Sequence, residues 1–453
     1  MSVFSATAKD FGRLAVRQRV SLSLVALYFG LHYIFYVYFV EPTMAWQLYK
    51  VGDYAWYWWL ASIILGLIPG LFLPTKIERV SDLAPWIQYV CVVGPAAYVP
   101  MHCFQEHFPS IFIYSIAFTV CLYLFDRARK YPIKFNFRSS RNSEGAFTYG
   151  FLIVTLLVTF YIWRSIDFKF DLGWGSMYDR RLAVRPLLAG GTALGYMNTF
   201  FIKGIVPLSV LFAIARKNYN LLWLTLLCVL VSFSFDGTKL VIFLPLGAMA
   251  LAYQWKTKKI ATFIYGLIVS FLAIGGLAIS GSETGAELAR SIIIRQTYAL
   301  AEIASFYYDY FAHAPYNWFA GSPFLGWVNP EKVINPYPKI IGLEYFNSID
   351  TNLNTGIFAS AYAEGGYFSM FLTAIAAGLI LKFVDSLGEK RSRFLGFCFC
   401  SLMAIEWTNS SFFTSFLSGG VVVLSLVLYF YPTERELRDP EPYPLGDLVP
   451  TQT

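Results

Sequence analysis

Three arginines cluster between two apolar runs of the sequence. Arg180, Arg181 and Arg185 lie within six residues. If this stretch is helical, Arg181 and Arg185 share one face, and Arg180 points about 100° away from them. Because a guanidinium group binds phosphate oxygens in pairs, the cluster predicts contact with an anionic, phosphorylated ligand. Anchoring to lipid headgroups at a membrane surface explains the cluster equally well.

A second pair of arginines, Arg290 and Arg295, lies five residues apart in a polar segment. On one ideal α-helix these side chains point about 140° apart, so one ligand reaches both only if the helix is interrupted between them. Arg290 lies near Glu283 and Glu287 and is open to a structural ion pair. Arg295 is therefore the better candidate for binding an anionic ligand.

Other charged residues lie beside or inside apolar runs, where an unpaired charge is costly. Asp236 and Lys239 occupy a short hairpin. They either neutralise each other or leave Lys239 as a cation that points into a cavity. Glu364 lies near the start of one apolar run and Glu406 lies inside the next. Each carboxylate needs a partner, so both are candidates for function.

Aromatic residues gather in the same half of the chain. Tyr308 belongs to the patch 306–311, and Trp318 belongs to the patch 316–319. Such side chains suit the faces of sugars and equally suit the membrane interface. Asn354 lies in a segment of asparagine and glycine that precedes an apolar run, where these residues form turns and permit close packing.

The histidines and cysteines contain no metal-binding motif. His102 and His107 enclose the pattern H-x-x-x-E-H, which matches neither order found in zinc proteases. The six cysteines lack C-x-x-C and zinc spacing, and we expect buried apolar side chains. The sequence has no Walker A motif and no G-x-S-x-G. We therefore predict no metal and no cofactor, and the net charge of +7 does not indicate nucleic acid.

Composition places these residues in a membrane protein. The chain of 453 residues is 57% hydrophobic and 14% charged, whereas a typical soluble domain is about 25% charged. Repeated apolar runs of about 20 residues predict an all-α polytopic membrane protein formed by a single domain, 1–453. The expected spans are 20–40, 54–74, 84–103, 109–125, 146–163, 195–214, 219–235, 239–255, 260–280, 363–384, 394–408 and 412–431.

The basic residues predict how these twelve spans are oriented. They concentrate in the segments placed inside, whereas the short outside loops hold only Lys50 and Lys239. Both termini are therefore expected in the cytoplasm, with 433–453 as a disordered tail. Two long loops, 164–195 and 281–362, are expected outside, and loops of this length are usually functional.

Short motifs accompany this layout. The hairpin Asp236–Lys239 is similar to a Gly-Ser/Thr-Arg turn, with lysine in place of arginine. The segment Asn354–Tyr367 is similar to an N-T-G sequence followed by G-x-x-G at a helix start, and Arg180 is followed eleven residues later by Gly191. Together with twelve spans and two long loops, these features resemble the bacterial O-antigen and oligosaccharide repeat-unit polymerases of the Wzy type.

The resemblance implies a metal-independent glycosyltransferase of the bacterial inner membrane, with a C-type glycosyltransferase-like bundle and both long loops in the periplasm. The substrates would be oligosaccharides linked to undecaprenyl pyrophosphate. An acceptor sugar hydroxyl would attack the anomeric carbon of the donor, and undecaprenyl pyrophosphate would leave. The expected partners are membrane lipid, a chain-length regulator and a flippase, with no nucleic acid.

The site residues follow from this chemistry, which requires positioning and stabilisation of charge on the leaving pyrophosphate. A carboxylate would take the acceptor proton, and the sequence does not choose among the candidates. The residues assigned to the pyrophosphate are Arg295, Arg290, Lys239, Arg180, Arg181 and Arg185; those assigned to proton transfer are Asp236, Asp350 and Glu364; those assigned to the glycan are Tyr308, Trp318 and Asn354.

Two other functions remain open. The related O-antigen ligases, which transfer lipid-linked glycan to the lipid A core, have a histidine next to an asparagine in the second large loop. Here Leu353 precedes Asn354 and His313 lies far upstream, which favours a polymerase. A polysaccharide or lipid transporter would predict charges in the middle of spans and helices broken in pairs. Clear mid-span charges are few in this sequence.

Overall fold

The computed structural model describes residues 2–44, 49, 55–104, 107, 109–133, 135, 144–168, 170–173, 177–188, 193–236, 239–320, 325–329, 336–349, 351–417 and 420–431. The α-helices are α1 (Ser2–Phe35), α2 (Glu41–Met44), α3 (Trp56–Leu67), α4 (Ala84–Gln88), α5 (Gly94–Ala96), α6 (Val99–Cys103), α7 (Ser110–Arg129), α8 (Glu144–Ser165), α9 (Met177–Leu188), α10 (Ala193–Phe200), α11 (Val206–Ala215), α12 (Tyr219–Asp236), α13 (Lys239–Thr257), α14 (Ile260–Ile279), α15 (Glu283–Leu288), α16 (Ala299–His313), α17 (Tyr337–Phe346), α18 (Ile357–Lys390), α19 (Arg393–Asn409), α20 (Phe412–Leu417) and α21 (Val421–Phe430).

Several α-helices continue directly into π- or 3-10-helical turns. The π-helical segments are η1 (Tyr36–Val40), η4 (Tyr89–Val93), η6 (Phe201–Ile205) and η7 (Ala289–Tyr298), and η3 (Ile68–Leu71) is 3-10-helical. All named elements in the described ranges are helices, which agrees with the predicted all-α class.

Within these ranges, seven helices are long and apolar enough to cross a membrane. They are Arg19–Met44, Ser110–Arg129, Thr148–Ser165, Met197–Ala215, Ile260–Ile279, Ile357–Lys390 and Phe412–Phe430. Two shorter apolar helices, Trp56–Leu71 and Tyr219–Ser234, accompany them. The length and composition of these helices indicate a membrane protein.

The count of twelve spans stays a prediction, because some expected spans coincide with short or interrupted helices. The range 84–103 contains α4, η4, α5 and α6 rather than one helix. A turn at Ala97 and Tyr98 ends the first helical run, and Pro100 in the next helix lacks the backbone donor that would continue it. The ranges 239–255 and 394–408 fall within α13 and α19.

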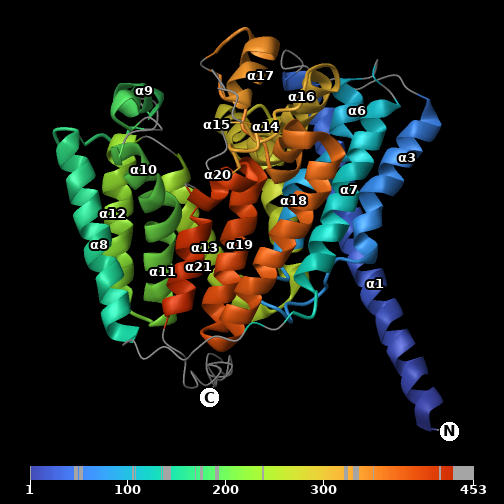
Figure 1. Cartoon of the computed structure of the whole chain (residues 1–453), viewed down its shortest axis with the longest axis horizontal. Helices are drawn as coiled ribbons and strands as arrows, with labels where there is room; N and C mark the ends of the chain where they lie inside the picture. The colour runs from blue at the N-terminus through green and yellow to red at the C-terminus, as the bar shows by residue number, and fades with distance from the viewer. Residues whose placement is uncertain are drawn as a thin grey trace, which may run out of the picture.

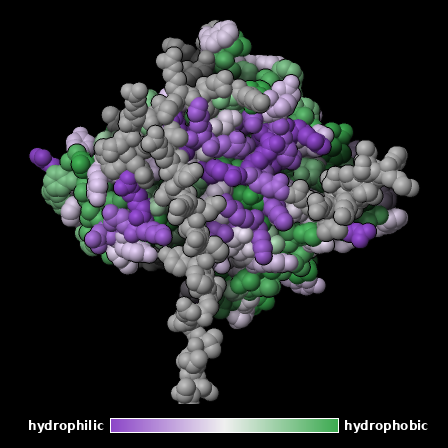
Figure 2. Space-filling model, turned by 90° about the horizontal axis from the view of Figure 1, so that it is seen from below, coloured by the Kyte–Doolittle hydropathy of each residue, from purple (hydrophilic) through white to green (hydrophobic). Residues whose placement is uncertain are grey.

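The long helices run between an upper end that carries additional short helices and a lower end that carries short connections (Figure 1). The elements α9, α15, α16 and α17, which come from the two long predicted loops, lie at the upper end. At the lower end, the backbones of Lys76 and Lys259 form an isolated antiparallel β-bridge. The Arg393 side chain donates a hydrogen bond to the Glu78 carbonyl oxygen at 2.7 Å. Figure 2 shows hydrophilic side chains gathered on this lower face. The long predicted loops and these short basic connections therefore lie at opposite ends.

A buried ionic cluster holds the lower end together. Arg129, which is fully buried, lies 2.7 Å from Asp82 and 2.6 Å from Asp126. The hydroxyl of Ser81 donates to Asp385 of α18 at 2.7 Å. A buried charge is tolerated only when it is paired and hydrogen-bonded, so this cluster fixes α7, α18 and the turn before α4 relative to one another. The long helix α18 also packs against α16 and α19 at the centre of the bundle.

Candidate functional site

The helix α18 is broken near its start, and the break builds one wall of the site. Gly365 has φ −173° and ψ 38°, and Gly366 has φ 63° and ψ −151°. Gly366 thus adopts a backbone conformation that is essentially restricted to glycine. A Cβ atom at this position would lie 2.9 Å from the Tyr316 hydroxyl oxygen. The glycine pair therefore allows α18 to change direction beside the loop that contains Tyr316.

That loop satisfies the backbone groups that the break exposes. The N–H of Asn317 donates to the Ala363 carbonyl at 2.8 Å, and the N–H of Trp318 donates to the Glu364 carbonyl at 2.9 Å. The Glu364 carboxylate accepts at Oε2 from the Phe319 N–H at 2.7 Å and from the Asn317 side-chain amide at 3.2 Å. Carbonyls at a helix break need new donors, and the loop provides them. One oxygen of Glu364 is thereby held in place.

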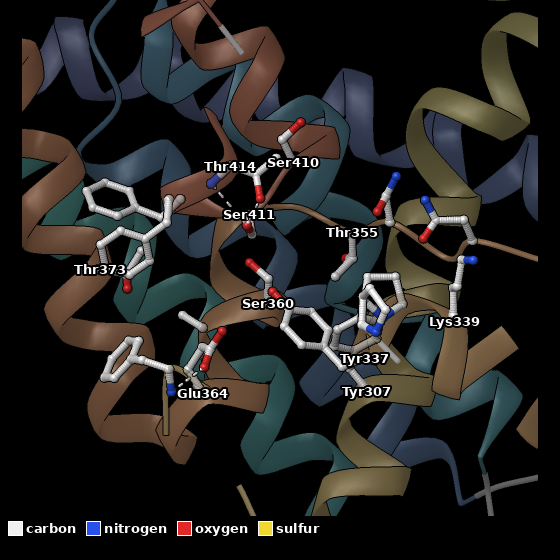
Figure 3. Close-up of a pocket in the computed structure, with 18 of the residues that line it drawn as sticks. Tyr307, Tyr337, Lys339, Thr355, Ser360, Glu364, Thr373, Ser410, Ser411 and Thr414 are labelled. Atoms are coloured by element: carbon white, nitrogen blue, oxygen red, sulfur yellow. Dashed lines mark hydrogen bonds between the residues drawn. The ribbon is translucent and has the colours of Figure 1, made fainter. Parts of the chain in front are cut away.

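A cavity of about 550 Å³ opens beside this carboxylate. Glu364 and Asn354, both assigned from the sequence, line the cavity. Lys203 and Lys339 also line it and contribute ammonium groups. Figure 3 shows hydroxyl groups around the cavity that come from several segments of the chain, namely those of Tyr307, Tyr337, Thr355, Ser360, Ser410 and Ser411. Such walls suit a ligand rich in hydroxyl groups.

The segment before α18 is held over the cavity by backbone contacts. The hydroxyl of Tyr307 donates to the Leu353 carbonyl at 2.9 Å, and the Leu353 N–H donates to the Pro338 carbonyl at 3.1 Å. A Cβ atom on Gly356 would lie 2.9 Å from backbone oxygens at the end of α19. Because only glycine permits this approach, the predicted Asn-Thr-Gly segment packs tightly and places Asn354 at the cavity.

Lys203 and Glu406 form an ion pair at the cavity wall. The ammonium nitrogen of Lys203 lies 2.7 Å from Glu406 Oε1, and the side chains are 23% and 13% exposed. The hydroxyl of Ser410 donates to the same carboxylate oxygen. Glu406 therefore has the partner that its position in an apolar run requires. The contact joins η6 to α19 across the site.

Tyr337 lies at the cavity in its protonated form. Burial raises the pKa of its phenol well above the ordinary value, and the negative charge of Glu364 raises it further. A phenol that keeps its proton can both donate and accept a hydrogen bond. Tyr337 can therefore contact a ligand hydroxyl beside Glu364.

The π-helix η7 changes the expected geometry of the second arginine pair. Both Arg290 and Arg295 lie in this segment of ten residues. Hydrogen bonds in a π-helix connect residues five positions apart. The angle of about 140° expected for an ideal α-helix therefore does not apply. Arg290 lies 3.9 Å from Glu287, with both side chains 52% exposed, which agrees with the predicted structural ion pair.

Arg295 lies within electrostatic reach of Arg181. The protein around Arg295 removes part of its hydration and lowers the pKa of the guanidinium, and the positive charge of Arg181 lowers it further. The Tyr49 hydroxyl acts in the opposite direction. The charge of an arginine in one long predicted loop therefore acts on an arginine in the other.

Of the remaining residues assigned to the pyrophosphate or to proton transfer, Arg180 has structural partners. Arg180 lies 2.8 Å from Asp171, and its guanidinium lies 5.4 Å from the ring centre of Phe233. These contacts fasten α9 to the preceding loop and to α12. Asp350 and the side chains of Arg185, Asp236 and Lys239 lie outside the described residues.

The two aromatic residues assigned to the glycan also differ from each other. Tyr308 is buried, with ring centres 4.8 Å from Tyr114 and 5.7 Å from Tyr362, and it does not line the cavity. Tyr308 thus packs in the protein core, and its assignment to a sugar stays a prediction. Trp318 has a side chain that is 49% exposed, and its backbone supports Glu364 as described above.

Sequence reasoning missed Lys339, Tyr337 and the lysine of the Lys203–Glu406 pair. Lys339 follows two prolines in the second long loop, and its charge needed an explanation because the orientation rule does not cover long loops. The charge of Lys339 could therefore have indicated a functional residue. Lys203 lies inside the expected span 195–214, where a charge needs a partner, but its partner Glu406 is distant in sequence.

Among the residues that the structure describes, no group of three or more His, Cys, Asp or Glu side chains could hold a metal ion. Comparison of the chain with protein-family models, curated proteins and solved structures finds no match in any of the three.

Proposed function

We propose that this chain is a polymerase that joins oligosaccharide repeat units, carried on undecaprenyl pyrophosphate, at the periplasmic face of a bacterial inner membrane. The product would be an O-antigen or exopolysaccharide. The observation that carries the proposal is the cavity beside α18, where a held carboxylate lies among hydroxyl groups and ammonium groups at the start of an apolar helix. Ligands that combine sugar hydroxyls with phosphates would match these walls.

In the proposed reaction, an acceptor sugar hydroxyl attacks the anomeric carbon of the donor. A new glycosidic C–O bond forms, the bond between the anomeric carbon and the pyrophosphate oxygen breaks, and undecaprenyl pyrophosphate leaves with the electron pair. Glu364 receives the acceptor proton. Of the three carboxylates assigned to this role, Glu364 is the one whose side chain lies in the described part of the chain, and it lines the cavity. Its hydrogen bonds at Oε2 orient the group for proton transfer.

The leaving pyrophosphate needs positive charge that is already in position. Arg181 and Arg295 supply guanidinium groups from the two long loops and influence each other electrostatically. The helix η7 that carries Arg295 is connected to the cavity, because the Asn409 amide donates to Gln296 at 3.1 Å and Asn409 directly precedes Ser410. Lys339 adds an ammonium group at the cavity itself. In this scheme, the arginines bind the pyrophosphate while the cavity binds sugar.

A transporter of polysaccharide or lipid is a second candidate, because α18 is broken at a glycine pair and Lys203 pairs with Glu406 between membrane helices. The two functions differ in their chemistry. A polymerase needs Glu364 as a proton acceptor, whereas a transporter makes no glycosidic bond.

Deletion of the gene, followed by electrophoresis of surface polysaccharide, tests the function. A polymerase predicts lipid A that carries single repeat units, or loss of exopolysaccharide, together with accumulation of lipid-linked single units outside the cytoplasm. A ligase predicts long lipid-linked chains that never reach lipid A. A transporter predicts lipid-linked units retained in the inner leaflet. An unchanged ladder would eliminate all three functions.

The role of Glu364 is tested in the complemented strain. Glu364→Gln keeps the size of the side chain and removes its basicity, so we expect loss of long chains of at least about 100-fold, the usual contribution of general base catalysis. The matched control is Glu344→Gln, which changes an exposed carboxylate on α17. Membrane levels of both variants are compared by immunoblotting. A full ladder from Glu364→Gln at normal protein level would remove Glu364 from the mechanism.

A further inference from the structure

A second cavity, of about 680 Å³, lies between α7 and the pair α3–η3, away from the cavity beside α18. Its walls are almost entirely apolar and come from helices that face outward from the bundle. Ile64 is 52% exposed and Leu71 is 55% exposed on one wall, and Ile116 is 37% exposed on the other. In Figure 1, α3 and α7 lie side by side at the edge of the bundle. The cavity is therefore a groove that opens sideways.

The wall formed by α7 follows one face of a membrane-spanning helix. Phe112, Ile116, Val120, Tyr123 and Arg127 line the groove at spacings of four, four, three and four residues. These spacings keep the side chains on one helix face. At about 1.5 Å per residue the face extends for about 22 Å from Phe112 to Arg127. One leaflet of a bilayer core is about 15 Å thick, so the groove is long enough for an extended acyl chain.

The groove ends at a positive charge. The guanidinium carbon of Arg127 lies 5.0 Å from the ring centre of Tyr123, and the Phe72 ring meets that tyrosine edge-on at 5.5 Å. The neighbouring carboxylate of Asp126 is already bound to Arg129 and Lys130. Arg127 is exposed and makes no ion pair with a described residue, so its charge is available at the mouth of the groove.

We infer that this groove is a binding site for one anionic phospholipid, with an acyl chain along α7 and the phosphate bound to Arg127. A long apolar slot that ends in a guanidinium without an ion-pair partner among the described residues is complementary to a lipid with a net negative headgroup. The aromatic pair Phe72–Tyr123 lies where such side chains favour the membrane interface. The site is separate from the proposed catalytic cavity and does not depend on the proposed reaction.

The test uses the purified full chain, stripped of lipid in detergent and then mixed with equal amounts of dioleoyl phosphatidylglycerol and dioleoyl phosphatidylcholine. Native mass spectrometry measures how much of each lipid stays bound to the protein. A charge-assisted contact predicts a preference for phosphatidylglycerol of about tenfold. Arg127→Gln should abolish this preference, because the variant keeps the apolar groove and loses the charge. The matched control, Lys76→Gln, removes an exposed cation at the same end of the molecule and should retain the preference.

A second variant tests the groove itself. Ala61→Phe places a ring inside the groove and should lower retention of both lipids while Arg127 is unchanged. Equal retention of the two lipids by the parent protein, or a preference that survives in Arg127→Gln, would overturn the inference. Displacement of phosphatidylglycerol by undecaprenyl phosphate at equal concentration would also overturn it, because the site would then belong to the lipid carrier.

Discussion

Replacing Gly366 with alanine tests whether the break in α18 requires glycine and whether the site depends on that break. The residue has φ 63° and ψ −151°, and a side chain in this region costs about 1–3 kcal/mol. A new Cβ atom would also lie 2.9 Å from the Tyr316 hydroxyl oxygen and 3.0 Å from the attached ring carbon. The alanine must therefore either strain the backbone or push the loop away from α18.

Gly276→Ala is the matched control. Gly276 lies inside α14, and a Cβ atom there meets no atom within 4 Å. Alanine in such a helical position is more favourable than glycine by about 0.5–1 kcal/mol. The two variants should therefore differ in stability by about 1.5–4 kcal/mol, with opposite signs relative to the parent. Thermal unfolding in one detergent measures this difference, and Gly366→Ala should melt at the lower temperature by at least about 2 °C.

The functional readout is the polysaccharide ladder at equal membrane level. Because the loop at Tyr316 also holds Glu364, movement of the loop should shorten or abolish the ladder in Gly366→Ala and leave it normal in Gly276→Ala. Equal melting temperatures for the two alanine variants would refute the strain argument. A full ladder from a destabilised Gly366→Ala would refute the link between the break and the carboxylate.

Three further predictions concern groups outside the break. Burial raises the pKa of Glu302 well above its ordinary value of 4.5, although a hydrogen bond with Tyr49 lowers it. The stability that the neutral acid contributes is therefore present below pH 4.5 and is lost as pH rises through the raised pKa. We expect Glu302→Gln to melt at a higher temperature than the parent at neutral pH, and the difference should close toward pH 4.5. Lys203→Met should destabilise the protein by about 1–3 kcal/mol, and adding Glu406→Gln should restore part of that loss in a double-mutant cycle. Arg295→Ala should abolish long glycan chains while the protein stays in the membrane, and a normal ladder at equal protein level would contradict its role.

The segment Asn354–Gly366 could be recognised from the sequence because its signals are local. Asparagine and glycine before an apolar run indicate a turn with close packing, and a carboxylate such as Glu364 at a membrane boundary indicates a need for partners. The structure places Asn354 and Glu364 at the same cavity. The all-α class was equally accessible, because apolar length and composition alone determine it.

The remaining parts of the site depend on contacts that no local pattern carries. Lys203 of η6 and Glu406 of α19 are 203 residues apart, and only the packing of the helix bundle brings them together. The π-helical winding at Arg295 is set by its surroundings, and the sequence reads equally well as an α-helix. The sequence also did not indicate that Tyr308 is buried, since the same aromatic spacing suits either a ligand or the core.

The break in α18 also explains which atoms of the loop 316–319 hold Glu364. Carbonyls left without donors inside a protein cost about 1–3 kcal/mol each, and the loop pairs two of them through backbone N–H groups. A third N–H, that of Phe319, binds the Glu364 carboxylate. The Glu364 carboxylate is therefore bound by the Phe319 N–H and by the Asn317 side-chain amide. In this arrangement Trp318 and Phe319 adopt left-handed φ of 46° and 64°. The ring of Trp318 takes no part in this contact, because its backbone N–H binds the main-chain carbonyl of Glu364.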